Sequence, residues 1–184
     1  LADAFTPLAK GMNSEYANQN AYDAIQIHGG SGFIMEYKSQ RLYRDARIFS
    51  IYEGTTQLQV VAAIRYITNG TYLSIMKEIM ERPICDCAAP MRERIAKLIE
   101  LYEDALNYVK EQNNQALQDF LARRLYEMTA DIIMSLLLLE DATRAPELFK
   151  KSIHVFVRHA EAECTAHHAY IKAMKAEDLE NFKA

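Results

Sequence analysis

The chain has 184 residues, of which half are hydrophobic and a quarter are charged, and its formal net charge is −4. This length and composition suit a globular protein with one or two domains. The charge gives no reason to expect a nucleic acid or an anionic membrane as a partner. Only 6 Gly and 4 Pro are present, while Ala, Leu, Met, Glu and Lys are frequent, so we expect an all-α fold with few turns.

The first expected helix runs from about residue 6 to residue 28. Thr6 suits the N-cap and Pro7 suits the first helical position. Small and apolar residues recur at helical spacing and form one stripe: Met12, Tyr16, Ala17, Ala21, Ala24, Ile25 and His28. Because the stripe is rich in alanine, another helix can approach it closely. Gly29 and Gly30 then end the helix.

Residues 31–54 form an irregular stretch that is dense in Arg, Asp and Tyr, with a short helix expected near residues 40–47. A further helix is expected from about Gly54 to Thr68. Its apolar face has i, i+3, i+4, i+7 spacing and consists of Val60, Ala63, Ile64 and Ile67. Asn69 and Gly70 then form a stop signal.

One short and three long helices are expected in the rest of the chain. The short helix, at about residues 72–80, leads into a connector that ends at Pro90. The long helices are amphipathic, with apolar stripes at Ile95, Leu98, Ile99, Tyr102, Leu106 and Val109; at Leu117, Leu121, Leu125, Met128, Ile132, Leu136 and Leu139; and at Phe149, Ile153, Phe156, Val157, Ala160, Cys164 and Ile171. A small antiparallel bundle follows. The longest apolar stretch, 132–139, is too short to span a bilayer.

Two stretches differ from ordinary helical sequence. Residues 26–33 read Gln-Ile-His-Gly-Gly-Ser-Gly-Phe, and residues 51–57 read Ile-Tyr-Glu-Gly-Thr-Thr-Gln. The glycines of the first stretch let a backbone approach a ligand, although a helix C-cap and turn would use the same residues. Glu53, in the second stretch, is explained by the helix dipole, which favours an acid near a helix start. A role as a catalytic base would need a neighbouring substrate site.

Together, and at this spacing, the two stretches resemble the C-terminal helical domain of acyl-CoA dehydrogenases. That family carries Gln-Ile-x-Gly-Gly-x-Gly-Phe, then Arg-Asp-Ala-x-Ile, then Ile-Tyr-Glu-Gly-Thr-x-Gln. This chain has every fixed position of the three segments, the second of them at residues 44–48. The resemblance covers about residues 1–67.

The resemblance implies that Glu53 is the catalytic base. Glu53 would take the pro-R α-proton of an acyl-CoA thioester while the β-hydrogen leaves as hydride to the N5 atom of FAD, giving a trans-2-enoyl-CoA. The backbone N–H of Glu53 and a flavin hydroxyl would stabilise the enolate-like oxygen. An electron-transferring flavoprotein would then take the electrons, as in fatty acid β-oxidation.

Further site residues are implied by the same resemblance. Those that would contact FAD are Thr55, Thr56 and Gln57, together with Gln26, Ile27, His28, Gly29 and Gly30, which would reach the FAD of a neighbouring subunit in a homodimer or homotetramer. Gly54 would leave room for the thioester, and Arg65 would contact substrate, although a solvated helix charge explains Arg65 equally well. For Arg44 and Asp45 we expect a structural role.

The expected domain organisation has three parts: an acyl-CoA dehydrogenase C-terminal domain at residues 1–70, a connector at 71–90 and an additional helical bundle at 91–184. The bundle departs from short-chain and medium-chain relatives, which end soon after the helix of Arg65. Because the chain begins at Leu1, we expect a C-terminal segment that is inactive alone. A helical oligomerisation module and an acyl-CoA oxidase are the alternatives.

The three cysteines are an odd number, which implies no disulfide framework and favours a reducing cytoplasm. Cys85 and Cys87 are expected to be connector residues without a role, with a metal site or a redox pair as alternatives. Cys164, His167 and His168 share one expected helix. We nevertheless expect no metal site, because no acidic partner from a second helix is evident.

Overall fold

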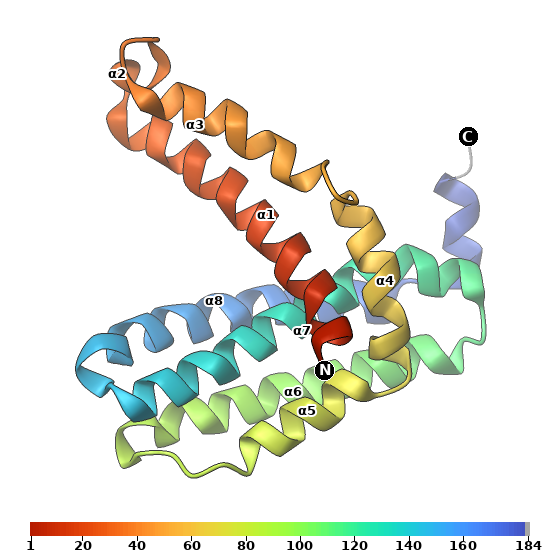
Figure 1. Ribbon diagram of the computed structural model, residues 1–184. Helices are drawn as coiled ribbons and strands as arrows, with labels where there is room; N and C mark the ends of the chain where they lie inside the picture. Colours follow the sequence, from red (N-terminus) through yellow and green to blue (C-terminus); the bar gives the residue numbers. More distant parts are fainter. Residues whose placement is uncertain (183–184) are drawn as a thin grey trace. The chain divides into compact units, whose positions relative to one another are not determined.

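The computed structural model describes residues 1–182, which form helices and connecting turns with no strand in that range (Figure 1). The expected all-α fold is therefore confirmed. The chain divides into two compact units, Leu1–Ala63 and the segment that begins at Ile64. The division falls within helix α4 (Thr56–Thr68).

Four helical elements precede α4 in the first unit. They are α1 (Ala2–His28), α2 (Gly30–Phe33), α3 (Lys38–Arg47) and the 3₁₀ turn η1 (Ile48–Ser50). Helices α1 and α3 lie side by side (Figure 1). Asn18 Nδ2 of α1 donates to Ala46 O of α3 at 3.1 Å, and Ser39 Oγ of α3 donates to Gly32 O of α2 at 3.0 Å.

The expected start of the first helix at Thr6 is wrong. Helix α1 begins at Ala2, and the Leu1 carbonyl accepts hydrogen bonds from the amides of Ala4 and Phe5 at 3.0 and 3.1 Å. Thr6 donates its hydroxyl to Ala2 O at 2.9 Å and caps nothing, and Pro7 lies inside the helix. Good helix formers before Thr6 extend the helix past a residue whose type suited a cap.

The second unit contains α5 (Thr71–Met80), η2 (Asp86–Ala88), α6 (Ala89–Glu111), α7 (Gln115–Arg144), α8 (Pro146–Ala173) and η3 (Ala176–Phe182). Helices α6, α7 and α8 pack against one another, and α5 contacts both α6 and α7. Every residue of the expected α6 and α7 stripes is buried. Helix α7 supplies the largest share of the buried residues in this unit.

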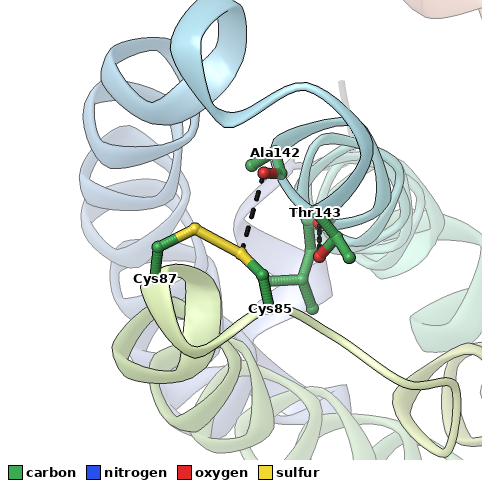
Figure 2. The surroundings of a disulfide bond; sticks show 5 residues. Cys85, Cys87, Ala142 and Thr143 are labelled. Carbon is green, nitrogen blue, oxygen red and sulfur yellow. Dashed lines mark hydrogen bonds between the residues drawn. A yellow bond between two sulfur atoms is a disulfide. The ribbon is translucent and has the colours of Figure 1, made fainter.

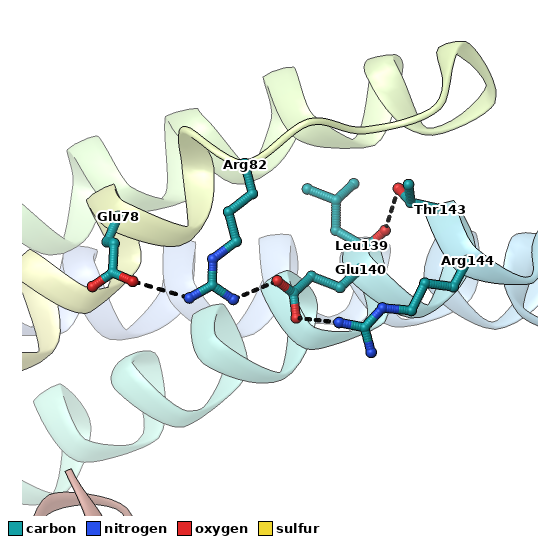
Figure 3. Close-up of polar contacts among 6 residues, drawn as sticks. All are labelled: Glu78, Arg82, Leu139, Glu140, Thr143 and Arg144. Carbon is teal, nitrogen blue, oxygen red and sulfur yellow. Dashed lines mark hydrogen bonds and ion pairs between the residues drawn. The ribbon is translucent and has the colours of Figure 1, made fainter.

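Polar contacts bind the end of α5 to the bundle (Figure 3). The Arg82 guanidinium donates to Glu78 Oε1 at 3.0 Å and to Glu140 Oε1 of α7 at 2.6 Å. The hydrogen bond to Glu140, followed by that to Glu78, raises the pKa of Arg82 above its ordinary value. Arg144 also reaches Glu140, at 3.7 Å. The first residues after α5 are therefore fastened to α7.

His167, on α8, is held as a neutral imidazole between two charged groups of α7. Burial lowers the pKa of His167 below its ordinary value of 6.5. Its Nε2 lies 3.3 Å from Glu127 Oε2, and its Nδ1 lies 3.4 Å from an Arg124 nitrogen. A neutral ring that donates through Nε2 and accepts at Nδ1 satisfies both neighbours.

The His167 environment predicts a loss of stability in mild acid. Because the folded-state pKa lies below the unfolded value of about 6.5, the unfolded chain binds more protons once the pH falls below that value. The stabilisation is present above about pH 6.5 and decreases as the pH falls. Urea unfolding at several pH values should show this slope for the native chain and a weaker one for His167→Gln. The exposed His159→Gln is the control, and an equal loss of slope in both variants would contradict the assignment.

Within residues 1–182 no helix combines the length and the apolar character that a membrane span requires. The same residues contain no group of three or more His, Cys, Asp or Glu side chains arranged for a metal ion. Cys85 and Cys87, however, form a disulfide bond (Figure 2). The structure thus pairs two cysteines that we expected to be unpaired connector residues, with a redox pair as an alternative, and the third cysteine, Cys164, is free and buried.

Candidate functional site

The turn that carries Glu53 and Gly54 lies between η1 and α4, and its backbone is unusual. Glu53 has φ 54° and Gly54 has φ 91°, so two consecutive residues lie in the left-handed region. Glycine adopts this conformation freely, but a glutamate does so at a cost of about 1–2 kcal/mol. Such residues concentrate at functional sites, where surrounding contacts hold them.

Two side chains hold the turn by its carbonyl groups. Lys10, on α1, donates from Nζ to Gly54 O. Gln59, on α4, donates from Nε2 to Glu53 O at 3.4 Å and to Gly54 O at 3.3 Å. The Glu53 backbone is therefore fixed from both sides by helices whose own positions are set by packing.

A cavity of about 370 Å³ opens beside this turn. Glu53, Tyr52 and Phe49 contribute one part of its lining, and the rest comes from α1: Lys10, Asn13, Ser14 and Ala17. The Glu53 side chain is exposed and makes no hydrogen bond or ion pair among the residues that the structure describes. Its carboxylate is thus free to accept a proton from a molecule that enters from this side.

Replacing Gly54 is expected to destabilise the turn. A Cβ at this position would lie 2.8 Å from Gln59 Nε2 and would require φ 91° of a residue with a side chain. Because the Gln59 amide can move away, the main cost of Gly54→Ala is the backbone term of about 1–2 kcal/mol. Urea unfolding should detect it. Gly30→Ala is the control, since no atom lies within 4 Å of a Cβ there, and equal losses in both variants would refute this account.

Thr55, Thr56 and Gln57 line a different cavity, of about 510 Å³. Thr55 caps α4, because its Oγ1 accepts from the Leu58 amide at 3.3 Å, and Thr56 donates to Glu15 Oε1 at 2.5 Å. Glu15 contributes its carboxylate to the same lining, and the other residues provide amide, phenol, guanidinium, hydroxyl and aliphatic groups: Asn18, Gln19, Tyr22, Tyr43, Arg47, Ser50 and Ile51. This mixture of aromatic rings and polar donors fits a flat, polar and anionic ligand, which is the chemistry of FAD.

Residues 26–30 are exposed at the end of α1 and the start of α2, and they line neither cavity. His28 Nδ1 contacts Ala24 O at 2.8 Å, and Gly29 has φ 60°. A Cβ added at Gly29 or Gly30 would meet no atom within 4 Å. No part of the described chain therefore covers the backbone of the two glycines, so another molecule can contact it.

Arg65 belongs to the second unit and is exposed. Its guanidinium donates to the Tyr66 hydroxyl at 2.9 Å and lies 4.6 Å from the centre of that ring. Asp45 pairs with Arg41 of its own helix at 3.7 Å instead of with Arg44. The loop after α3 is instead held by Arg47, which donates to Ser50.

Several residues that hold the Glu53 turn or line the cavities were not predicted from the sequence. Lys10 is a single lysine in an expected helix, and no local pattern marks it. Gln59 follows the recognised motif, but its role depends on reaching back over a left-handed turn. Glu15 and Arg47 are charged residues on helices, a type that usually faces solvent, and only the packing of α1 beside α3 brings them to the 510 Å³ cavity.

Two family models together match nearly the whole chain. The model described as acyl-CoA dehydrogenase, C-terminal domain, matches residues 2–67. The model described as acyl-CoA dehydrogenase C terminal matches residues 68–179, which is more than half of the chain.

Individual relatives agree. The caffeyl-CoA reductase-Etf complex subunit CarC of Acetobacterium woodii is 56% identical over 52 residues, which are 28% of this chain and 14% of that protein. An acyl-CoA dehydrogenase family protein from Porphyromonas gingivalis has a solved structure with TM-score 0.59 and 36% identity, covering 62% of this chain and 98% of that chain. An acyl-CoA dehydrogenase of Bacillus anthracis complexed with FAD shares the fold at TM-score 0.73 and 20% identity, covering 95% of this chain and 34% of that chain.

Proposed function

We propose, because the chain belongs to the acyl-CoA dehydrogenase family, that it is the C-terminal part of a flavin-dependent enzyme that oxidises an acyl-CoA to a trans-2-enoyl-CoA. The chain spans only 14% of the curated relative from Acetobacterium woodii, so this activity belongs to the whole protein. The observation that carries the proposal is the position of Glu53: an unpaired carboxylate on a left-handed turn at the wall of a cavity.

Glu53 would act as the base. An α-proton is too weakly acidic for a free carboxylate to remove, so the negative charge that develops on the thioester oxygen must be stabilised as the proton leaves. The backbone N–H of Glu53 serves this purpose in our proposal, and the ties from Lys10 and Gln59 keep that amide in place. Gly54 and Arg65 are both proposed to contact the substrate, Gly54 at the thioester.

Two segments are proposed to hold FAD. Thr55, Thr56 and Gln57 would contact it at the 510 Å³ cavity, and Gln26, Ile27, His28, Gly29 and Gly30 would contact the FAD of a neighbouring subunit, which implies a homodimer or homotetramer. FAD, when bound, supplies the acceptor for the β-hydride. The crystal structure of the Bacillus anthracis relative with FAD supports this choice of cofactor.

The partner and the setting are proposals of the same kind. The relative from Acetobacterium woodii is named as a subunit of a reductase-Etf complex, which supports an electron-transferring flavoprotein as the electron acceptor. We place the protein in the cytoplasm. The division into a dehydrogenase domain at residues 1–70, a connector at 71–90 and a helical bundle at 91–184 is the organisation that we propose for this part of the enzyme.

Reduction of an enoyl-CoA is the second candidate, because that same relative is named a reductase. The two reactions are the two directions of one chemistry. In the reductive direction Glu53, in its protonated form, would deliver the α-proton that it removes in the oxidative direction.

The test uses the full-length protein with its flavin. A panel of saturated acyl-CoAs is added to the oxidised protein, and a panel of enoyl-CoAs is added to the reduced protein, while the flavin absorbance is followed. Loss of the oxidised flavin band with a saturated acyl-CoA supports the dehydrogenase. Its return with an enoyl-CoA alone supports the reductase. A protein that binds no flavin, or whose flavin responds to neither panel, would contradict both reactions and favour a helical oligomerisation module. Formation of peroxide would favour an acyl-CoA oxidase.

A further inference from the structure

The Cys85–Cys87 disulfide is poorly suited to a purely structural role. Only Asp86 separates the two cysteines, whose Cα atoms are 5.3 Å apart. A disulfide restricts the unfolded chain roughly in proportion to the logarithm of the loop that it closes, so a bridge across one residue contributes far less than one across a long loop. We therefore expect the bond to add little to the stability of the fold, and a role in thiol–disulfide chemistry is the alternative.

The two sulfur atoms have different surroundings (Figure 2). Cys85 is half-buried, and its Sγ lies 3.8 Å from the carbonyl oxygen of Ala142 at the end of α7. If the bond were reduced, the Cys85 thiol would have this acceptor within reach. Cys87 is exposed, and it precedes α6 by two residues. An incoming reagent thus meets Cys87 first.

Cys87 also forms part of the wall of a cavity of about 750 Å³, which lies within the second unit. Apolar residues such as Met91 and Ile153 line much of it, while Lys150, Lys151 and His154 contribute basic groups from α8. Neither lysine has an ion pair among the described residues. In a chain with net charge −4, two unpaired lysines that line the same cavity as Cys87 make that cavity locally attractive to an anion. The volume is typical of small-molecule sites.

We propose that Cys85–Cys87 is a thiol–disulfide exchange site for a small thiol that carries carboxylates or phosphates and docks in the adjacent cavity. The thiolate sulfur of that molecule forms a bond with Cys87 Sγ, the bond between Cys85 and Cys87 breaks, and Cys85 leaves as a thiolate that takes a proton from solvent. A second thiol then attacks the mixed disulfide at the sulfur of the first. This step releases the oxidised small molecule and leaves two reduced cysteines, so two electrons pass to the protein.

The remaining cysteine is excluded from this chemistry. Cys164 is fully buried in α8, and burial raises the pKa of its thiol well above the ordinary value. Its thiolate is therefore scarce at neutral pH, and the thiolate is the reactive form. The proposal does not depend on Glu53 or on flavin, so its outcome and that of the acyl-CoA reaction are separable.

The test measures exchange on the full-length protein after oxidation to one disulfide per chain. Glutathione, coenzyme A and the neutral 2-mercaptoethanol are supplied at equal thiolate concentration, the reaction is quenched with acid, and the adduct is located by peptide mass spectrometry. Among the three cysteines of residues 1–184 we expect an adduct only on Cys87, formed about tenfold faster by the anionic thiols because the lysines attract them. A faster reaction with glutathione would identify carboxylate recognition, and a faster one with coenzyme A would identify phosphate recognition.

Matched variants separate the cavity from general charge. Lys150→Gln with Lys151→Gln should remove the preference for anionic thiols, whereas Lys97→Gln with Lys110→Gln, which changes two exposed lysines of α6, should leave it intact. Cys87→Ser should abolish the adduct. Failure to oxidise the pair, an adduct on Cys85, or equal rates for charged and neutral thiols would each overturn the proposal.

Discussion

Replacing Glu53 by glutamine is expected to abolish the reduction of flavin by acyl-CoA in the full-length protein while leaving the flavin bound. The amide keeps the size of the side chain and its place on the left-handed turn, but it cannot take a proton. Removing a general base typically costs between about 10² and 10⁴ in rate. Stopped-flow absorbance at the oxidised flavin band, recorded at saturating acyl-CoA, gives the rate constant of this step directly.

Control variants separate the loss of the Glu53 base from a general effect of removing a surface charge. Glu81→Gln changes another exposed glutamate and should leave the rate constant unchanged. Glu53→Asp keeps the carboxylate but shortens it, and it should retain part of the activity. Normal bleaching by Glu53→Gln would remove Glu53 from the role of base. Loss of flavin from that variant would show that the residue holds the cofactor instead.

Shortening Leu136 to alanine is expected to destabilise the bundle strongly. Leu136 is fully buried in α7. Leucine-to-alanine substitutions at such sites cost about 3 kcal/mol, because the transfer energy of the lost methyl groups adds to that of the cavity. Urea unfolding of the 184-residue chain, followed by circular dichroism, measures this loss.

Leu137 provides a control on the next residue of the same helix. Its side chain is 47% exposed, so Leu137→Ala makes the same chemical change without opening an internal cavity. Substitutions at such positions usually alter stability by within about 0.5 kcal/mol. If both variants unfolded at the same urea concentration, the packing described for α7 would be incorrect.

The second unit was largely predictable from the sequence because its signal is periodic. The stripes of α6 and α7 have one apolar face each, and burial of that face leaves few alternative arrangements. The same reasoning failed at the start of α1, where helix propensity overrode a good capping residue. Periodicity also predicted the buried residues of the first unit less well. Ala17, Ala21 and Ala24 are only half-buried there, and large apolar residues such as Phe33 and Met35 are exposed.

The residues of the candidate site could be predicted only where they belong to a motif of the resembling family. Glu53 and Gly54 were found through a family resemblance, yet nothing in the letters of the motif gives the left-handed backbone at Glu53. The partners of that turn come from residues 44 positions earlier and 5 positions later in the chain. The Lys10 contact depends on tertiary packing, which local patterns do not encode. The Gln59 contact is local, but it depends on the left-handed turn that precedes α4. The disulfide was only an alternative at the level of the sequence, because an odd number of cysteines argued against a disulfide framework, although Cys85 and Cys87 are separated by a single residue.

The burial of Cys164 has a use in measuring motion. This free thiol lies against the interior of the bundle, so an alkylating reagent reaches it only when α8 moves away from its neighbours. Under native conditions the labelling rate of Cys164 therefore reports the free energy of that opening. A value equal to the global unfolding free energy would mean that α8 detaches only when the whole bundle melts. A smaller value would identify α8 as a separate cooperative segment.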